Sequence, residues 1–237
     1  MQKVNNDVTL EFLTGIDVPQ ATRTYVPVSH RSIIDSIKEQ SDKLGFQIKN
    51  ESYLSNKQGT QMLGRFGFLT DDTTMGTELA FRNSYDKSLS IKVITGEQLW
   101  ICKNGSMIGS DNNYSKKHVS DVNVLTPSTI SEYINSSFDN FEKAIKIRER
   151  MKEIELSKRT ISTLVGRMFL EDSVINTAQL AIIKNELISP TFNYEADNSL
   201  WEFFNHTTYS LKQNHPMTYM NQQVKLKKFF QDEYQLV

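Results

Sequence analysis

The sequence predicts an α+β protein, in which an antiparallel sheet of four to five strands is crossed by a long helix and followed by a helical C-terminal part. Three observations predict this class. Short alternating runs of apolar and polar residues, separated by turn residues, follow one another between positions 46 and 103. A threonine and a proline, Thr126-Pro127, then begin a run with helical spacing. Beyond residue 158 the apolar patterns are helical.

The N-terminal segment is predicted to contain a strand, an extended stretch and a helix. Residues 8–13 alternate in polarity, and residues 21–28 are typical of an extended chain. Ser29 suits the N-cap of a helix from His30 to Leu44, because its hydroxyl can accept a hydrogen bond from the first turn. Gly45 stands where a glycine commonly ends a helix. The apolar positions of this helix share one face: Ile33, Ile34, Ile37 and Leu44.

Consecutive hairpins are predicted to form the sheet. Gly59-Thr60 and the stretch at 71–76 supply turns between strands. Gly64 and Gly67 lie inside the second predicted strand, where glycine indicates a bulge or the close approach of another backbone. The strands are expected at 46–54, 60–69, 77–83 and 89–95, with a fifth around 98–103.

The long helix is predicted to run from Thr126-Pro127 to about Ser157. Its apolar residues recur at spacings of three and four, and its other positions are charged. We therefore expect it to lie across the sheet with a solvated outer face. The apolar stripe consists of Ile130, Ile134, Phe138, Phe141 and Ile145.

The remaining chain is predicted to be helical. Helices are expected at 160–188 with an interruption near Asp172, at about 197–213, and in a last segment that ends at 225–230. We expect residues 1–157 to form an α+β core domain. Residues 158–237 would then be a helical C-terminal extension packed on that core.

Composition and charge exclude several classes of protein. No run of residues approaches the roughly 18 apolar residues of a transmembrane helix, and the N-terminus lacks the apolar core of a signal peptide. The single cysteine allows neither an internal disulfide nor a cysteine-ligated zinc cluster, so we expect a cytoplasmic protein without metal or cofactor. The net charge of −1 argues against strong nonspecific DNA binding by a monomer but permits a local basic stripe.

Three short motifs lie between residues 83 and 118. They read NSYDKS, then WICKNG about a dozen residues later, then a lone histidine in KKH. This pattern resembles phage/plasmid-like proteins of domain-of-unknown-function family 932, in which the corresponding pieces read roughly Ser-His-Asp-Gly-Ser, Val-Cys-Xaa-Asn and His-Thr. The positions of the motifs here are Asn83, Ser84, Tyr85, Asp86, Ser88, Cys102, Asn104 and His118.

The resemblance covers about residues 25–225 and includes the segment SLWEFFNHTTYSL near the C-terminus. It implies a mobile-element origin, from a phage acting in the cytoplasm of its bacterial host, and it implies no known reaction. Two positions depart from the family pattern. Tyr85 stands where histidine is usual and Lys87 where glycine is usual, so a proton transfer assigned to that histidine does not carry over.

A cysteine–histidine site is one candidate for chemistry. Cys102 and His118 fit a nucleophile and its base, with Asn104 orienting the imidazole. The favoured interpretation is that Cys102, which follows Trp100 and Ile101, is a small buried strand residue.

A second candidate is the hexapeptide itself. Asp86 with Ser84 and Ser88 would suit a metal or a phosphate, but the favoured interpretation is a polar turn whose side chains satisfy their own backbone. His206, close to Trp201, is expected to be an interior or interfacial histidine rather than a ligand.

Basic side chains are spread over the predicted strands and the loop before the long helix. If the strands adjoin, several of these side chains would line a groove for phosphates, with Tyr85, Trp100 or Tyr114 available for base stacking. Ordinary solvated charge is the alternative, because acidic residues are interleaved with them. The basic residues are Arg65, Arg82, Lys87, Lys92, Lys103, Lys116 and Lys117.

The sequence states no reaction and leaves three functional hypotheses. The first is a phage protein that binds nucleic acid, with single-stranded DNA as partner, in recombination or replication. Its order of hairpins and a crossing helix is similar in outline to phage single-strand annealing proteins, which hold DNA in a groove around a homo-oligomeric ring. The second is an interaction module that inhibits a host defence or housekeeping factor. The third is a small enzyme using Cys102 with His118, or Asp86.

Overall fold

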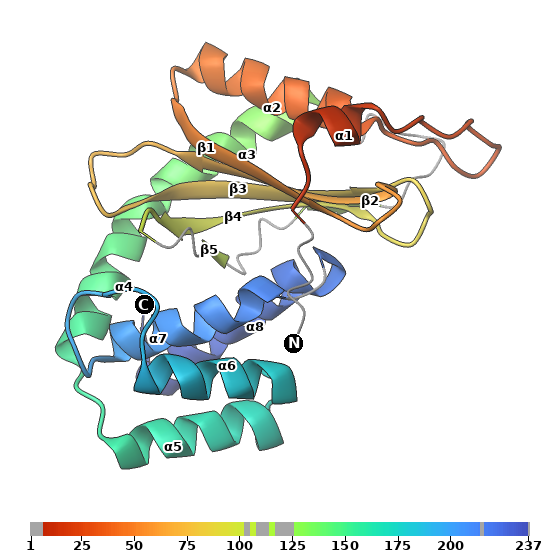
Figure 1. Ribbon diagram of the computed structural model, residues 1–237. Helices are drawn as coiled ribbons and strands as arrows, with labels where there is room; N and C mark the ends of the chain where they lie inside the picture. Colours follow the sequence, from red (N-terminus) through yellow and green to blue (C-terminus); the bar gives the residue numbers. More distant parts are fainter. Residues whose placement is uncertain (1–6, 102–104, 108–113, 117–125, 214–215, 237) are drawn as a thin grey trace.

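The computed structural model describes residues 7–101, 105–107, 114–116, 126–213 and 216–236. An antiparallel sheet separates two helical layers, one above the sheet and one below it in the view of Figure 1. This arrangement confirms the predicted α+β class. The helices are α1 (Leu10–Thr14), α2 (His30–Leu44), α3 (Pro127–Asp139), α4 (Phe141–Glu153), α5 (Lys158–Gly166), α6 (Thr177–Ile188), α7 (Leu200–Ser210) and α8 (Pro216–Tyr234), with a π-helical turn at Arg167–Glu171 and a 3-10 turn at Leu211–Gln213.

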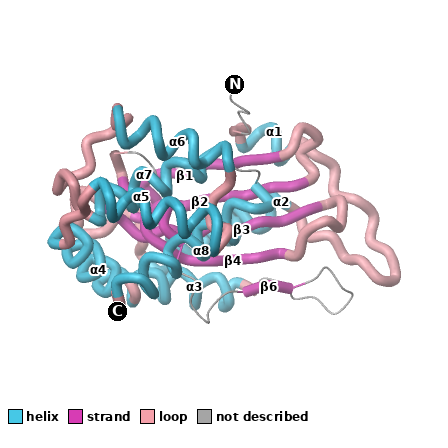
Figure 2. Tube along the Cα trace, turned by 90° about the horizontal axis from the view of Figure 1, so that it is seen from below, coloured by secondary structure: helices cyan, strands magenta, loops and turns pink. Residues whose placement is uncertain are grey.

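Four long strands form the sheet in the order β1-β2-β3-β4, and every pair is antiparallel. Two short strands, β5 and β6, both pair with β4. Figure 2 shows the long strands side by side, with β6 along the outer side of β4. The strands are β1 (Ile48–Ser55), β2 (Gln61–Phe68), β3 (Met75–Ser84), β4 (Ile91–Leu99), β5 (Gly105–Met107) and β6 (Tyr114–Lys116).

The predicted strand at 8–13 is wrong, because this segment forms helix α1. The hydroxyl of Thr9 accepts a hydrogen bond from the amide of Phe12 at 3.2 Å and so caps the helix. Only Asp7 makes a bridge to the sheet in this described stretch, opposite Leu54 on β1. The N-cap at Thr9 therefore determines the local structure, although apolar and polar residues alternate over six positions here.

Helix α2 begins and ends as predicted. The Ser29 hydroxyl accepts a hydrogen bond from Ser32, and Gly45 ends the helix with a left-handed φ of 77°. The predicted apolar face packs on the upper side of the sheet, against Phe66 and Phe81. Because α3 contributes Ile130 and Ile134 to the same cluster and α1 contributes Leu13, helices α1, α2 and α3 cover this face.

The expected turn between residues 95 and 98 is absent, and the two strands predicted there are one continuous strand, β4. Gly96 pairs with Glu78 on β3 and with Met107 on β5. Gly96 has a paired strand on either side, and the backbone hydrogen bonds to both strands hold it in an extended conformation, so it does not turn the chain. The end of the predicted fifth strand, at Cys102, lies outside the described residues.

The glycines of β2 are confirmed as points of close approach. A Cβ atom on Gly64 would lie 2.3 Å from the ring of Phe81, and one on Gly67 would lie 2.3 Å from Oε1 of Gln98. Each glycine therefore makes room for a side chain of a neighbouring strand.

The single helix predicted from residue 127 to 157 is interrupted at Asn140. The side-chain amide of Asn140 donates to the carbonyl of Ser136 at 2.8 Å, and α4 begins at the next residue. Phe138 stacks on Phe46 in the upper layer, with ring centres 3.8 Å apart, whereas Phe141 lies in the lower core. The interruption lets the chain pass from one layer to the other.

Helices α4 to α8 form the lower layer. They share one apolar cluster with Leu63, Ala80 and Ile94, which point down from three strands of the sheet. This cluster contains residues from both sides of the boundary at 157/158, and the division into two domains stays a prediction.

Candidate nucleic-acid interface

The hexapeptide forms the turn between β3 and β4, and Asp86 organises it. Oδ1 of Asp86 accepts a hydrogen bond from the Ser88 amide at 3.0 Å, and Oδ2 accepts one from Nε2 of Gln61 at 2.8 Å. Burial raises the pKa of Asp86, but the hydrogen bonds from Ser88, Gln61 and Thr60 outweigh it, so the pKa lies below its usual value. The predicted polar turn is confirmed.

Lys87 occupies the left-handed position of this turn, with a φ of 63°. Glycine adopts that conformation without steric cost, which explains why glycine suits this position in the family pattern. The ammonium group of Lys87 is exposed and lies 4.8 Å from the ring centre of Tyr25. The hydroxyl of Tyr25 in turn lies 3.2 Å from the carbonyl oxygens of Ser84 and Tyr85. The turn is thereby tied to the loop that precedes α2.

Behind the turn, Asn83 and Tyr85 fix the start of helix α2. The rings of Tyr85 and His30 stack with centres 3.9 Å apart, and the Tyr85 hydroxyl accepts a hydrogen bond from the His30 amide at 2.7 Å. Nδ2 of Asn83 donates to the Val28 carbonyl at 2.7 Å and to Nδ1 of His30 at 3.0 Å. Nδ1 is then the acceptor, so Nε2 carries the proton and donates to the carbonyl of Gly59.

His30, Asn83 and Tyr85 are all buried, which assigns them a structural role. Burial also raises the pKa of Tyr85. The sequence identified His30 only as the first residue of a helix, since Tyr85 and Asn83 are more than fifty residues away along the chain.

Arg82 and Lys92 are direct neighbours on β3 and β4, just before and after this turn. Nε of Arg82 donates to the Ser90 carbonyl at 3.4 Å, and the Lys92 ammonium donates to Asn221 of α8 at 3.0 Å. Burial lowers the pKa of both groups, and the charge of Arg82 lowers that of Lys92 further. Two half-buried cations therefore lie side by side at this end of the sheet.

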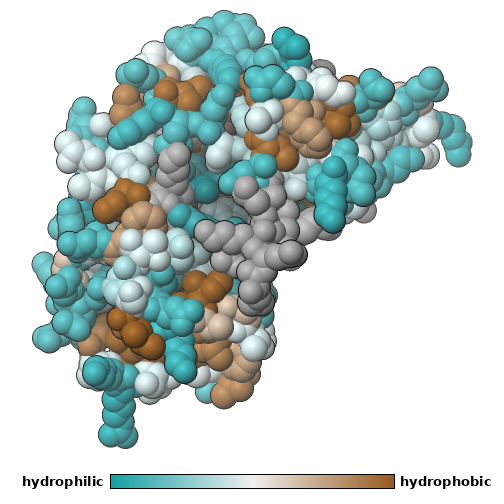
Figure 3. Space-filling view, in the orientation of Figure 1, coloured by the Kyte–Doolittle hydropathy of each residue, from teal (hydrophilic) through white to brown (hydrophobic). Residues whose placement is uncertain are grey.

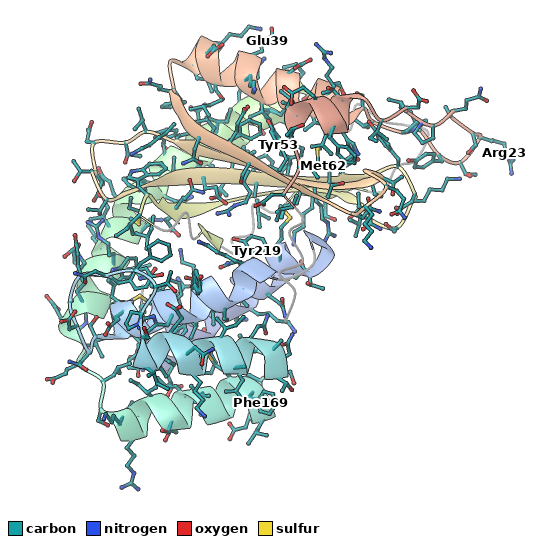
Figure 4. The ribbon with its side chains drawn as sticks, in the orientation of Figure 1. Arg23, Glu39, Tyr53, Met62, Phe169 and Tyr219 are labelled. Carbon is teal, nitrogen blue, oxygen red and sulfur yellow. The ribbon has the colours of Figure 1, made fainter. Side chains whose placement is uncertain are left out.

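Two further turns carry exposed cations to the same end. Lys57 lies in the β1–β2 turn, and Arg23 lies in the loop between α1 and α2. Figure 4 shows Arg23 at the tip of that loop, pointing away from the rest of the protein, and Figure 3 shows that the projecting tip is hydrophilic. We call this surface the basic end, and it consists of Arg23, Lys57, Arg82, Lys87 and Lys92.

The basic end differs in charge from the chain as a whole. Its three segments, 17–29, 55–61 and 82–92, contain these five cations and two carboxylates, Asp17 and Asp86. The complete chain has a net charge of −1. The fold thus gathers positive charge that the sequence distributes evenly.

Arg65, which was predicted to line the groove, lies instead in a buried ion pair beneath the sheet. Its Nε and Nη2 atoms donate to the two carboxylate oxygens of Glu78 at 2.9 and 2.6 Å. Burial raises the pKa of Glu78, and the Arg65 charge opposes that effect. The guanidinium carbon also lies 5.4 Å from the ring centre of Tyr219 on α8. Arg65 therefore does not contribute to the basic end.

The other predicted site residues lie on β6 or outside the described residues. Lys116 pairs through its backbone with Ile91 on β4. Cys102, Lys103, Asn104, Lys117 and His118 lie outside the described residues, so the cysteine–histidine hypothesis stays a prediction.

Within the described ranges, no three His, Cys, Asp or Glu side chains converge as ligands for a metal ion. No helix in that part of the chain has the length and apolarity needed to cross a membrane.

The fold and the site define an α+β protein with a basic, tightly hydrogen-bonded hairpin end. The chain belongs to the family described as a domain of unknown function (DUF932), whose model matches residues 20–230. This confirms the family that the short motifs resemble, whereas the phage or plasmid origin stays a prediction. No curated protein and no solved structure matches the chain.

Proposed function

We propose that this protein binds single-stranded nucleic acid through its basic end, in the recombination or replication of a phage. The observation that carries the proposal is the concentration of five cations and two carboxylates on three adjoining segments. Two contacts hold the segments together, because Nε2 of Gln61 donates a hydrogen bond to Asp86 and the ammonium group of Lys87 lies over the ring of Tyr25. Phosphates are the anions that such a surface would attract.

The two half-buried cations suit a phosphate particularly well. The charge of Arg82 lowers the pKa of Lys92, so the two groups repel one another. A phosphate between them would relieve that repulsion and accept hydrogen bonds from both. Lys57, Lys87 and Arg23 would add exposed contacts whose strength falls with salt.

An antiparallel meander with helices packed on one face also supports the proposal by analogy with phage annealing proteins. Those proteins act as rings, so a homo-oligomer of this chain would bring several basic ends together.

The first prediction concerns DNA affinity. A variant with Lys57→Ala and Lys87→Gly should bind single-stranded DNA about tenfold more weakly at moderate salt, because it loses two phosphate contacts. Fluorescence anisotropy of labelled single-stranded and duplex DNA, at low and moderate salt, measures the change. The slope of affinity against salt should also become shallower in the variant.

The matched control removes two exposed cations from the lower layer, Arg159→Ala with Lys184→Ala. It should leave the affinity unchanged, since these residues lie on α5 and α6, away from the sheet. Absence of binding by the wild type at micromolar protein and low salt would reject the proposal. An equal loss in the control would reject the basic end as the site.

A second candidate function is inhibition of a host protein through the lower layer. It is favoured by Leu170 and Ile188, which are 76% and 74% exposed. Leu170→Ser and Ile188→Ser should then abolish capture of one stoichiometric host partner while DNA binding persists. Capture of no such partner by the wild type would count against this candidate.

A further inference from the structure

Phe12 is the most exposed of the phenylalanine, tyrosine and tryptophan side chains whose burial the structure describes. It is 39% exposed, and it belongs to neither of the two apolar clusters on the faces of the sheet. Leu13, the next residue on α1, enters the upper cluster instead. Helix α1 therefore directs one apolar side chain into the core and presents an aromatic ring to solvent, where apolar surface is unfavourable.

The ring of Phe12 lies against the β1–β2 turn, which carries Lys57 of the basic end. A Cβ atom on Gly59, in that turn, would lie 3.2 Å from Cε1 of Phe12 and 2.6 Å from Cγ1 of Ile16. Gly59 also has a left-handed φ of 72°. Glycine at this position thus lets α1 and the residues after it pack directly on a turn of the basic end.

The other segments of the basic end adjoin the same turn. The Thr60 hydroxyl donates to Oδ2 of Asp86 at 3.4 Å, which links the β1–β2 turn to the β3–β4 turn. Val18, 45% exposed, lies at the start of the loop that carries Arg23. Figure 3 shows hydrophobic side chains on the surface over α1, next to the hydrophilic tip of that loop. An exposed aromatic ring and exposed cations therefore adjoin.

The carboxylate that neighbours Phe12 in the sequence faces a different part of the surface. Glu11 lines a hollow beside β1 together with Asp7 and Glu51. Phe12 is not among the described residues that line this hollow. Its ring is therefore grouped with the cations of the basic end rather than with these three carboxylates.

Cations and an exposed ring contact different parts of a nucleic acid. Lysine and arginine attract the phosphates of any strand, whereas an aromatic ring stacks on a base face, which only a single strand leaves free. We propose that Phe12 stacks on a base of the bound strand and thereby selects single-stranded over duplex nucleic acid. This role of Phe12 rests on the proposed function, because the basic end must first hold the phosphates.

Two labelled strands of equal length and charge separate stacking from phosphate binding, namely oligo(dT) and a strand of abasic sites. Phe12→Leu keeps an apolar side chain but removes the ring. In fluorescence anisotropy it should lower the affinity for oligo(dT) about fivefold and leave the affinities for the abasic strand and for duplex DNA unchanged. Phe12→Trp should retain the affinity for oligo(dT). The Lys57→Ala, Lys87→Gly variant should bind both single strands more weakly, since their phosphates are the same.

The Phe12→Trp variant also reports stacking directly. The fluorescence of the indole that it introduces, measured as the difference from the wild type, should be quenched by oligo(dT) and not by the abasic strand. An indole that only filled space on the turn would respond to neither strand. Circular dichroism and urea unfolding establish that each variant is folded, and if Phe12→Leu does not fold, the quenching in Phe12→Trp decides alone.

Unchanged affinity of a folded Phe12→Leu protein for oligo(dT) would overturn the role of Phe12. So would an equal loss on both single strands, because the effect would then act through the fold and not through a base. Either result leaves the basic end in place if the lysine variant binds more weakly than the wild type. A wild type that binds neither strand at low salt rejects the proposed function, and the stacking role with it.

Discussion

At the scale of single residues, Lys87 combines an unfavourable backbone conformation with an exposed charge. Its φ of 63° is unfavourable for any residue with a Cβ atom, whereas its exposed ammonium group adds charge to the basic end. The hydrogen bonds of Asp86 hold the turn in this conformation. The turn therefore holds a lysine in a conformation that glycine would adopt without strain.

A second prediction follows for Lys87. Replacing it by glycine should raise the free energy of unfolding by about 0.5–1 kcal/mol, because the strain disappears at a small entropic cost. Urea unfolding followed by circular dichroism measures this change. Lys57→Gly, in a turn where the residue has no positive φ, should give no such gain. A Lys87→Gly protein less stable than the wild type would contradict the argument.

His206 is a residue whose buried site makes stability depend on pH. It is 2% exposed, and its Nδ1 and Nε2 atoms lie 3.6 Å from Glu186 and 3.8 Å from Glu202, with the ring of Tyr194 edge-on to it. Burial lowers the pKa of His206 below its ordinary value of 6.5, although both carboxylates oppose the shift. The expectation of an interior histidine is confirmed.

A third prediction uses the sign of that shift. Below pH 6.5 the unfolded chain binds a proton at His206 more readily than the folded chain does, so the stability from this site is complete above pH 6.5 and declines on acidification. His206→Gln should therefore flatten the fall of Tm between about pH 6.5 and 5. Thermal unfolding across that range gives the comparison. Identical pH profiles for both proteins would show that His206 does not contribute.

At the scale of elements, α8 makes an unusually polar contact with the sheet. Lys227 donates to both carboxylate oxygens of Glu97, at 2.7 and 2.8 Å, and Lys92 donates to Asn221. Gln223 is buried one turn away from Lys227, and neither of its amide atoms has a partner in the described part of the chain. The interface thus mixes a satisfied ion pair with an unsatisfied amide.

A fourth prediction separates the two kinds of polar group. Gln223→Leu should stabilise the protein by about 1–2 kcal/mol, because a side chain of similar size replaces two unpaired buried atoms. Lys227→Met should destabilise it by about 3 kcal/mol, because the carboxylate of Glu97 is left buried without its cation. Chemical denaturation of both variants measures the two changes in the free energy of unfolding. A loss of stability in Gln223→Leu would mean that water or another group satisfies this amide.

At the scale of the whole molecule, the two ends of strand β4 have different surroundings. The basic end lies where β3 turns into β4, and a pocket lined by Trp100, Trp201 and Tyr194 lies at the far end of β4. The lower helical layer contributes to both, through Asn221 at one end and Trp201 at the other.

The sequence by itself determined those features whose causes lie within a few residues. Ser29 and Gly45 delimit α2, and Asp86 forms its turn with Ser88, because caps and turns depend on neighbouring backbone groups. The same local reasoning failed at Gly96, where pairing on both sides keeps an apparent turn extended. It also failed at Asn140, where the change of direction depends on which layer each phenylalanine enters.

Only the tertiary structure decided where the charges and the aromatic rings meet. The sequence predicts Arg65 to be a surface cation, but in the fold it pairs with the buried Glu78. Lys227 pairs with Glu97, which lies 130 residues away along the chain. Trp100 and Trp201 likewise share a pocket that no spacing in the sequence indicates. Long-range pairs are chosen by burial and by the requirement that buried polar groups be paired, and both are properties of the assembled layers rather than of any segment.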